Sequence, residues 1–498
     1  MYPLSSMLPY GVLTDYFNNI VNKGADTELS NIQFLEREIQ EWKSNPIRNE
    51  MILADNYYSG RQKILSNKRE AIGEDGKTEE LTNLPNNRIV DNQYKKAVDE
   101  KKNFFIAKPV TITTDDKDFG TAVKKYFNKK MHSKLNRVCR ECIDKGIAYL
   151  YPYYDENGVL QWKHFRSWDV IPFFEDEERT ILHSFGRLYQ IEGYSGNERK
   201  VFEYFEYYTK DGISHYRLDG STLVPDERYE KDIYPYMEVP AEGGIEKTGY
   251  NWNRIPLIYF KRNDKEEPLI RSTKSLQDAI NSIISNFVNN MEEDTHNTIM
   301  VLVNYDGENL GEFRHNLAKY GAVKITTVDG VAGDVRTLQV TVNAENYKAI
   351  LGILKEALVE NAKSFNVKDN RLTSDANQMH IATAYHDMDL DTDDMEVEWQ
   401  SALEDMMFFI KADMQNKGIN VPADDEVKIT FNRNMMIDET SVIQNCVVSK
   451  DIISDETIRS KHPWCINPDK ERELLKAQHE EEIGYQPTNI VPNYPPKE

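Results

Sequence analysis

Residues 270–298 read IRSTKSLQDAINSIISNFVNNMEEDTHNT, and residues 343–365 read NAENYKAILGILKEALVENAKSF. In both stretches apolar residues recur three or four positions apart, which is the spacing of one face of an α-helix. They are Leu276, Ile280, Ile283, Phe287 and Met291 in the first stretch, and Tyr347, Ile350, Leu354, Leu358 and Phe365 in the second. Each stretch is therefore predicted to be an amphipathic helix. Because the apolar stripe of an exposed rod is stable only where neighbours bury it, we expect other copies of the chain to pack against these helices.

The regions between and before these two helices are predicted to contain strands and a further helix. Residues 299–342, between them, carry two strand-like runs at 299–303 and 335–342. Residues 148–260 are rich in aromatic and β-branched residues and are interrupted by turn sequences such as Asp219-Gly220, which is typical of a β-meander. Upstream, Ser30-Asn31 is a candidate cap for a helix with apolar residues at Leu35, Ile39 and Trp42.

Length and composition exclude several classes of protein. With 498 residues, the chain exceeds the roughly 250–300 residues that one core spans, so two or more core regions are expected. The formal net charge of −22 argues against tight general DNA binding, because such affinity comes from cations that replace the counterions on phosphate. No apolar run approaches the roughly 18 residues of a membrane helix. The first residues do not resemble a secretory signal, and four cysteines are too few for a disulfide scaffold, so we expect assembly in a cytoplasm and no membrane partner.

A basic stretch covers residues 121–140, which contain seven Lys or Arg residues and no acid. Apolar positions from Val123 to Cys142 fall at helical spacing, so the stretch is predicted to be one amphipathic helix. Its interleaved Tyr126 and Phe127 are compatible with nucleic-acid contact. We favour the alternative, a solvated face or one that docks on an acidic neighbouring subunit, because the chain as a whole is acidic.

An acidic stretch lies within a helix predicted from residue 376 to about 415. Residues 387–405 contain nine Asp or Glu residues and no Lys or Arg. Thr392 and its neighbouring Asp residues are poor helix formers, so a break is expected there. The alternating Asp387, Asp389, Asp391 and Asp393, followed by Glu398, imitate the spacing of a calcium loop, but Thr392 stands where the sharp turn requires Gly. A solvated or channel-facing acidic surface is the preferred interpretation.

Catalytic and metal motifs give no positive signal. Cys139-x-x-Cys142 has metal spacing, and His462 and Cys465 are further candidate ligands, but Cys142 already fits the apolar stripe of its predicted helix. The sequence has no HExxH pair, no GxSxG elbow and no GxxxxGK[ST] phosphate loop. We therefore expect no enzymatic activity, no cofactor and no bound metal.

A series of landmarks in a fixed order resembles one protein family. The segment from Pro85-Asn86-Asn87-Arg88-Ile89-Val90-Asp91 to Asn103-Phe104-Phe105-Ile106-Ala107-Lys108-Pro109-Val110 is similar to a conserved segment of portal proteins of tailed bacteriophages with long non-contractile tails. The residues 173–176 and 254–260, the helix pair around its insert, and the residues 429–435 and 453–457 follow in the same order. The resemblance covers roughly residues 30 to 480.

This resemblance implies an α+β portal fold and a division of the chain. Residues 1–269 would form the N-terminal part of a wing, helical and then a β-meander. Residues 270–298 and 343–365 would be the two stem helices, with a small α/β clip at 299–342 and a tunnel loop at 366–375. Residues 376–433 would supply a long helix and complete the wing, and residues 434–498 would form a helical crown and a flexible C-terminal tail.

The resemblance also implies a function, partners and sites. The chain would form a ring of usually twelve subunits, or thirteen when isolated, at the capsid vertex of the virion. This head–tail connector would be the channel for DNA during packaging and ejection. Its partners would be the terminase large subunit, head-completion or adaptor proteins, major capsid and scaffolding proteins, and weakly bound double-stranded DNA. The implied tunnel-loop residues are Lys363, Asn366, Lys368, Asn370, Arg371, Thr373 and Ser374. The implied clip residues are Asn304, Asp306, Glu308, Glu312, Arg314, Lys319 and Lys324.

Physical reasoning about the acidic charge agrees with a conduit for DNA. A wall that attracted phosphates would hold the duplex, whereas repulsion within the Debye length of roughly 8–10 Å lets it slide. Lys363, Lys368 and Arg371 are then candidates for transient contacts that retain DNA. Two alternatives stay open: a metal-dependent hydrolase or nuclease that uses the carboxylates from Asp387 to Glu398, and a virion structural protein without a channel.

Overall fold

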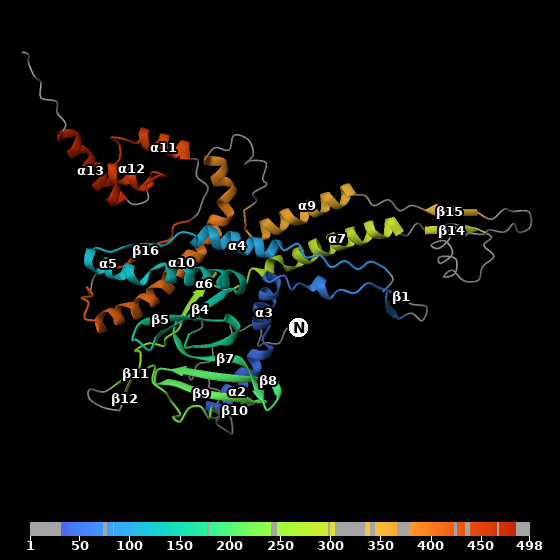
Figure 1. Cartoon of the computed structure of the whole chain (residues 1–498), viewed down its shortest axis with the longest axis horizontal. Helices are drawn as coiled ribbons and strands as arrows, with labels where there is room; N and C mark the ends of the chain where they lie inside the picture. The colour runs from blue at the N-terminus through green and yellow to red at the C-terminus, as the bar shows by residue number, and fades with distance from the viewer. Residues whose placement is uncertain are drawn as a thin grey trace, which may run out of the picture. The chain divides into compact units, whose positions relative to one another are not determined.

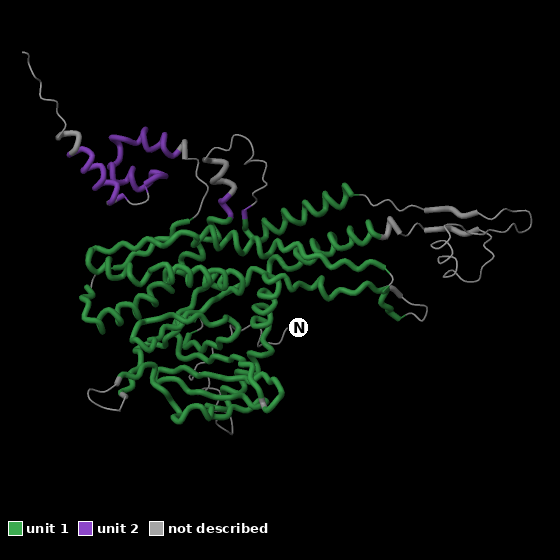
Figure 2. The backbone as a smooth tube through the Cα atoms, in the orientation of Figure 1, with its two compact units in different colours: residues 1–364, 388–434 green, residues 365–387, 435–498 purple. Residues whose placement is uncertain are grey.

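The computed structural model describes residues 31–72, 77–82, 84–176, 179–240, 247–296, 299–303, 334–338, 344–365, 378–422, 426–433, 439–465 and 468–484. Helices and sheets are mixed along the chain, in agreement with the predicted α+β class (Figure 1). The chain divides into two compact units (Figure 2). Unit 1 comprises residues 1–364 and 388–434, and unit 2 comprises residues 365–387 and 435–498.

Unit 1 begins with two helices, α2 (Asn31–Ser44) and α3 (Pro46–Tyr58). The predicted apolar face of α2 is confirmed, since Leu35, Ile39 and Trp42 are buried. Asn45 separates the two helices, and its side chain accepts a hydrogen bond from the backbone N–H of Ile47 at 2.9 Å. The following Pro46 suits the first position of a helix, where no N–H is needed. A 3₁₀ turn, η2 (Lys63–Ser66), and a hairpin of β1 (Glu70–Ile72) and β2 (Thr78–Glu80) come next.

The helices that follow are α4 (Gln93–Ile106), α5 (Lys117–Tyr126) and α6 (Lys129–Lys145). The prediction of one continuous basic helix from Val123 to Cys142 is wrong, because the chain turns between α5 and α6. Asn128 caps α6: its side chain accepts hydrogen bonds from the backbone N–H groups of Lys130 and Met131 at 2.9 and 3.1 Å. An Asn at this position satisfies the free N–H groups of a new helix, and this local preference outweighs the continuing apolar periodicity.

Two antiparallel sheets fill the region predicted to be a meander. One has the strand order β10-β9-β8-β7-β6 and the other β13-β4-β5. Their strands are β4 (Ile147–Tyr154), β5 (Leu160–Phe165), β6 (Val170–Phe174), β7 (Leu182–Ser195), β8 (Glu198–Thr209), β9 (Gly212–Asp219), β10 (Thr222–Pro225) and β13 (Ile258–Lys261), with η3 (Ser167–Asp169) before β6. Gly220 has a φ of 65° in the two-residue turn that joins β9 to β10, a conformation that glycine adopts without strain.

Two further strand pairs complete the sheets of unit 1. Strands β11 (Met237–Pro240) and β12 (Lys247–Tyr250) form a hairpin. Strand β3 (Thr111–Thr113) pairs with β16 (Lys428–Thr430), with Ile112 opposite Ile429. Their pairing joins segments more than three hundred residues apart and has no local sequence signal.

The two helices predicted around the insert are present as α7 (Ile270–His296) and α9 (Ala344–Asn361). Strands β14 (Ile299–Val303) and β15 (Asp334–Leu338) follow α7 and precede α9 in sequence, and they pair antiparallel with Ile299 opposite Leu338. The strand predicted at 335–342 is therefore confirmed for residues 335–338, and residues 339–342 lie outside the described part of the chain.

The long helix α10 (Gln378–Asn416) is continuous, so the predicted break at Thr392 is wrong. Thr392 is buried, and its hydroxyl donates a hydrogen bond to the carbonyl of Met388 at 2.6 Å, which satisfies its polar atom inside the helix. Met395, Trp399 and Met406 are also buried. Burial of this apolar face stabilises the helix more than the low propensity of Thr and Asp destabilises it.

The core of unit 1 joins elements from distant parts of the chain. The ring of Phe105 on α4 stacks on Phe431 after β16 with centroids 4.4 Å apart, and it meets Trp399 of α10 edge-on at 5.2 Å. Phe260 of β13 lies 4.6 Å from Trp399. Cys142 is also buried, and its thiol donates to the carbonyl of Phe260 at 3.3 Å. Burial raises the pKa of the Cys142 thiol to about 12, as is usual for a thiol in an apolar core.

Unit 2 contains the first turns of α10 and three further helices, α11 (Glu439–Val448), α12 (Asp455–Lys461) and α13 (Pro468–Gly484). Ser454 caps α12, since its hydroxyl accepts a hydrogen bond from the backbone N–H of Thr457 at 3.3 Å. Within this unit Phe365 stacks on Tyr385 with ring centroids 4.2 Å apart. Several large apolar side chains are exposed here, among them Val448 at 74% and Ile452 at 78%.

Candidate functional site on the paired helices

Helices α7 and α9 lie side by side and run antiparallel (Figure 1). Near the end of α7, the amide of Asn290 donates to the hydroxyl of Tyr347 in the first turns of α9 at 2.9 Å, and the ring of Phe287 lies 5.0 Å from the Tyr347 ring. Towards the other end of α9, Lys355 forms an ion pair of 2.6 Å with Asp91. Helix α9 is thus held near its start by α7 and towards its other end by the segment before α4.

One face of α7 is both polar and buried. Its members are four residues apart and are Thr273, Gln277, Asn281, Ser285 and Asn289. Residues at this spacing lie on one side of a helix, and buried polar groups need hydrogen-bond partners. The hydroxyl of Thr273 donates to the carbonyl of Leu269, one turn earlier. The other four find partners in residues 87–94, which run as an extended segment into the first turn of α4. We call this arrangement the polar ladder.

The polar ladder follows from the matching rise of a helix and an extended chain. Four helical residues advance about 6 Å, and two extended residues advance about 6.6 Å, so the N–H groups of every second residue from 87 to 91 meet successive turns of α7. The fourth donor, Tyr94, follows three residues later in the first turn of α4. The N–H of Asn87 donates to Asn289, that of Ile89 to Ser285, that of Asp91 to Asn281 and that of Tyr94 to Gln277, at 2.7, 2.9, 3.0 and 2.9 Å respectively. The ladder was not predicted from the sequence, although the polar i, i+4 stripe on α7 was its visible signal.

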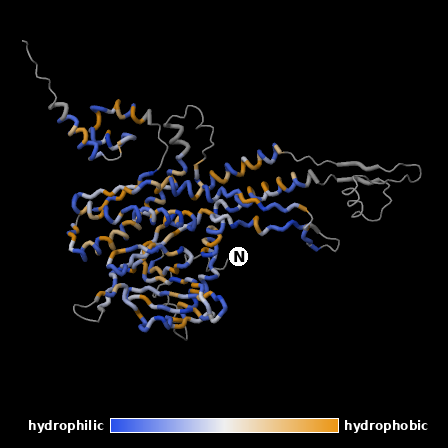
Figure 3. Tube along the Cα trace, viewed as in Figure 1, coloured by the Kyte–Doolittle hydropathy of each residue, from blue (hydrophilic) through white to orange (hydrophobic). Residues whose placement is uncertain are grey.

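Part of the apolar surface of the helix pair remains open. Ile280 and Leu358 are buried, but Met291, Ile350 and Ile353 are 47%, 48% and 65% exposed. Figure 3 shows hydrophobic residues along α9. The space beside Gly352 is also open, since nothing within the chain lies within 4 Å of where its Cβ would be. A single copy of the chain therefore leaves an apolar strip on α9 exposed to water.

At the end of α9, Lys363 is the one predicted tunnel-loop residue that the structure describes. It adopts a φ of 46°, and its ammonium lies 3.2 Å from Oδ1 of Asp391 on α10. The same carboxylate accepts a 2.6 Å bond from buried Lys101 and lies 3.5 Å from Arg262. Burial opposes ionisation of Asp391, but these cations outweigh it and hold its pKa at about 2. Burial also lowers the pKa of Lys101 to about 8.

Arg433 neutralises another part of the acidic stretch. Its guanidinium pairs with Asp389 and Asp393 and donates to Glu396 at 2.7 Å. Burial alone would lower the pKa of Arg433, but its bonds to the three carboxylates outweigh burial and raise it. Together with the cations around Asp391, Arg433 therefore neutralises part of the acidic stretch within the chain, while the side chain of Asp393 is still 56% exposed. That the stretch faces a channel stays a prediction. Distant Lys and Arg residues compensate a charge that looks isolated in the sequence.

The regular geometry of α10 is relevant to the calcium loop and the metal-dependent hydrolase that were considered from the sequence. A calcium loop needs an irregular backbone that turns around the ion, whereas residues 387–398 lie on the regular helix α10. In the described ranges no group of three or more His, Cys, Asp or Glu side chains is placed to hold a metal ion. The hydrolase alternative that used the carboxylates from Asp387 to Glu398 therefore gains no support from the geometry.

The remaining predicted site residues lie outside the described residues. These are the tunnel-loop residues Asn366, Lys368, Asn370, Arg371, Thr373 and Ser374, and the clip residues Asn304, Asp306, Glu308, Glu312, Arg314, Lys319 and Lys324. Within the described ranges no helix is both long and apolar enough to cross a membrane.

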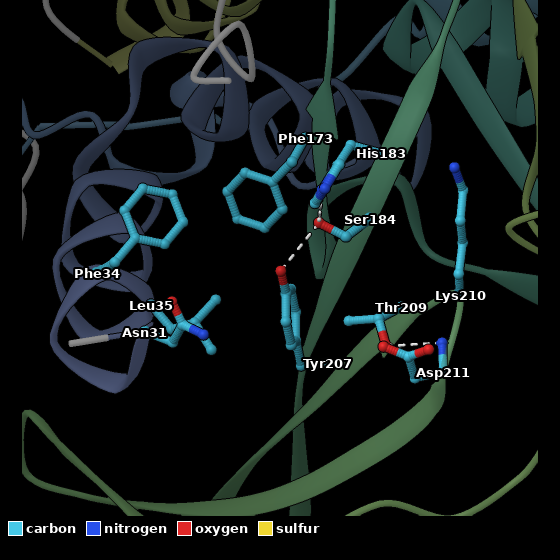
Figure 4. Close-up of a pocket in the computed structure, with 10 residues that line it drawn as sticks. All are labelled: Asn31, Phe34, Leu35, Phe173, His183, Ser184, Tyr207, Thr209, Lys210 and Asp211. Carbon is cyan, nitrogen blue, oxygen red and sulfur yellow. Dashed lines mark hydrogen bonds between the residues drawn. The ribbon is translucent and has the colours of Figure 1, made fainter. Parts of the chain in front are cut away.

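A cavity of about 390 Å³ lies between α2 and the five-stranded sheet (Figure 4). Phe34 and Phe173 form an aromatic wall with ring centroids 5.6 Å apart. On the opposite side, the Ser184 hydroxyl lies 3.1 Å from His183 Nδ1 and 3.0 Å from the Tyr207 hydroxyl. Because these polar groups are already satisfied by one another and Ser184 is buried, we assign no chemistry to this cavity.

Comparison with known proteins identifies the class. The profile of the family described as "Phage portal protein, SPP1 Gp6-like" matches residues 38–485, so the chain belongs to this family of phage portal proteins. It is 26% identical over 399 residues to the portal protein of Bacillus phage SPP1, an alignment that covers 79% of this chain and 76% of that protein. It is 24% identical over 431 residues to the portal protein of Clostridium phage phiCD119, which covers 84% of this chain and 90% of that protein. The resemblance noted in the sequence is thereby confirmed.

Proposed function

We propose that the chain is one subunit of a ring that forms the DNA channel at the capsid vertex. Phage portal proteins are virion components at that vertex, and membership of the family implies a ring oligomer. Beyond this, we propose that DNA passes through the ring during packaging and ejection. The terminase large subunit and then a head-completion protein would dock on it, and capsid and scaffolding proteins would surround it. Assembly would take place in the host cytoplasm, with twelve subunits in the ring, or thirteen in isolation.

The proposed assignment of segments follows the family layout. Helices α7 and α9 would be the stem, residues 299–342 the clip and residues 366–375 the tunnel loop. Residues 1–269 and 376–433, which include the long helix α10, would form the wing, and residues 434–498 the crown and C-terminal tail. The clip residues named above would then meet the terminase, and the tunnel-loop residues would meet the DNA.

The observation that carries the ring is the exposed apolar strip of α9. Ile350 and Ile353 lie exposed on a helix that is already anchored by the buried Leu358 and by the Lys355–Asp91 pair. Such a strip on a rigid helix is stable in water when another surface covers it, and a symmetric ring supplies the same complementary surface to every copy. The exposed Val448 and Ile452 of unit 2 support the same interpretation.

The described cations favour a channel wall that holds DNA weakly. Lys363 is half exposed but is already paired with Asp391, so it can touch a phosphate only in competition with that carboxylate. A net charge of −22 on each subunit adds repulsion at short range. We therefore propose that Lys363 acts together with Lys368 and Arg371 in brief contacts. If replacement of all three by Ala left DNA packaging and retention unchanged, this role would be refuted.

The ring is tested by native mass spectrometry of the purified protein and of two α9 variants. Ile353→Asp places a charge on the exposed apolar strip and is expected to shift the protein from the ring to single copies. Glu356→Gln changes an exposed residue of the same helix and should leave the ring intact. If the unmodified protein is a single copy at micromolar concentration, or if Ile353→Asp assembles as well as Glu356→Gln, the proposed ring contact is wrong.

A further inference from the structure

The basic stretch, residues 121–140, has no role in the proposed ring. The chain turns a sharp corner within this stretch, between α5 and α6. Asn128 caps α6 at this corner, so Lys125 near the end of α5 lies close to Lys130 and Lys134, which are one turn apart on α6. These three lysines and Lys417, just after α10, line a cavity of about 400 Å³. A helix that had continued straight through Asn128 would have carried Lys125 away from the other two.

The cavity combines a cationic rim with an apolar floor. Its floor includes Met131, Leu160 and Trp162, which are buried. Two exposed apolar side chains, Val159 and Ile419, lie at its edge. Apolar surface next to uncompensated charge is the composition of a recognition site that takes an anionic group attached to an apolar body.

Three of the four lysines that line the cavity have no carboxylate partner among the described residues. In the part of the chain that the structure describes, no Asp or Glu lies within ion-pair distance of Lys125, Lys130 or Lys134. Lys134 donates to the backbone carbonyl of Trp162 instead. Burial, and then the charges of Arg137 and Lys130, lower the pKa of Lys134. An anion between these side chains would relieve the repulsion.

The acids near the cavity are already occupied. Asp413 is buried, accepts a bond of 2.6 Å from the Tyr126 hydroxyl and pairs with Lys417 at 2.6 Å. Asp155, in the turn beside Val159, accepts bonds from the backbone N–H groups of Asn157 and Val159. These two described carboxylates are therefore not free to pair with Lys125, Lys130 and Lys134.

We propose that this cavity, lined by Lys125, Lys130 and Lys134, is a docking site for an acidic peptide segment of a partner protein. Carboxylates of the peptide would pair with the three ammonium groups, and an apolar side chain between them would enter over Ile419 and the Trp162 floor. Charge complementarity and the apolar floor both favour a peptide over duplex DNA. A duplex presents phosphates along an extended rigid surface and has no apolar side chain that could enter over the floor of the cavity. The site does not depend on the ring.

Fluorescence anisotropy of the full-length protein with a short labelled peptide of Glu, Leu and Ala tests the proposal. The double variant Lys125→Glu/Lys130→Glu is expected to weaken peptide binding by roughly ten-fold or more, as the loss of two ion pairs implies. The matched control is Lys124→Glu/Lys129→Glu, which makes the same change of net charge on the same two helices at exposed residues that do not line the cavity. This control is expected to change binding less than two-fold.

Further experiments distinguish the possible ligands of the cavity. Replacing every Glu of the peptide by Gln should abolish binding, and Ile419→Ala should weaken it with no change in net charge. The proposal is overturned if the peptide does not bind or if both double variants weaken it equally. It is also overturned if duplex DNA displaces the peptide from the cavity, or if the Lys125/Lys130 variant changes the number of subunits in the assembly. Circular dichroism of each variant verifies that the fold is retained.

Discussion

Replacing Asn281 by Ala is predicted to destabilise the join between α7 and the segment that leads into α4. Asn281 is fully buried at the centre of the polar ladder. Its Oδ1 accepts from the N–H of Asp91 and from the amide of Gln277, both at 3.0 Å, and its Nδ2 donates to Gln62 at 2.5 Å. Ala removes all three bonds and leaves buried donors unpaired.

The size of this effect follows from the contacts. A net contribution of about 1 kcal/mol for each hydrogen bond, with a further penalty for an unpaired buried N–H, gives a loss of about 2–4 kcal/mol in the free energy of unfolding. The matched control is Asn286→Ala on the same helix, where the side chain is exposed and a change within about 0.5 kcal/mol is expected. Ser285→Ala removes only the acceptor for Ile89 and should cost about 1 kcal/mol.

Urea unfolding measures the loss, and native-state hydrogen exchange locates it. In Asn281→Ala the amide of Asp91 should exchange faster, with a smaller effect at Ile89, while amides of the five-stranded sheet stay unchanged. If Asn281→Ala and Asn286→Ala had equal stability, or if exchange at Asp91 were unaffected, the polar ladder would not be what holds this segment to α7.

The remaining predictions concern the charges on α10 and the thiols. Asp391→Ala should lower the free energy of unfolding by about 3–5 kcal/mol, because it leaves the buried ammonium of Lys101 without a carboxylate. The control Asp394→Ala, at an exposed residue of the same helix, should change it by less than about 0.5 kcal/mol. Urea unfolding compares the two variants, and equal losses would contradict a stabilising Lys101–Asp391 pair. The pKa of Asp391 is about 2 in the folded protein, below its unfolded value of about 3.9, so its contribution is fully present above that value and is lost as the pH falls towards 2. Asp391→Asn should therefore flatten the decline of stability between about pH 5 and pH 2, and an unchanged slope would show that other groups cause it. Burial raises the pKa of the Cys142 thiol to about 12, so Cys142 should react with Ellman's reagent only after unfolding. The half-buried Cys446 should react in the native protein. Fast labelling of Cys142 without denaturant would contradict its burial in the core.

Helices and strands whose apolar residues recur at a regular spacing could be predicted from the sequence. The stripes on α7 and α9, the β-rich middle of the chain and the length of α10 all follow from apolar spacing. The break predicted at Thr392 is wrong because the low helix propensity of Thr and Asp is a small local effect. Burial of Met395 and Trp399 against residues distant in the sequence stabilises the helix by more. The break before α6 was overlooked although Asn128 is a good capping residue, because the apolar period continues across it.

The arrangement of charges could not be predicted, because it depends on contacts between distant segments. Nothing near Asp391 in the sequence indicates Lys101 or Arg262, and nothing near Asp389 indicates Arg433. The acidic stretch therefore looked unpaired. The polar stripe of α7 was visible, but its partner is an extended segment nearly two hundred residues away. Lys363 was selected as a candidate for DNA contact, and only the structure shows that a carboxylate already holds it.

The most direct test of a ring around an open channel is negative-stain electron microscopy of the purified full-length protein. Class averages should show rotationally symmetric rings with a stain-filled hole on the axis. Solid particles without a hole, or single copies that stay monomeric at micromolar concentration, would contradict the account.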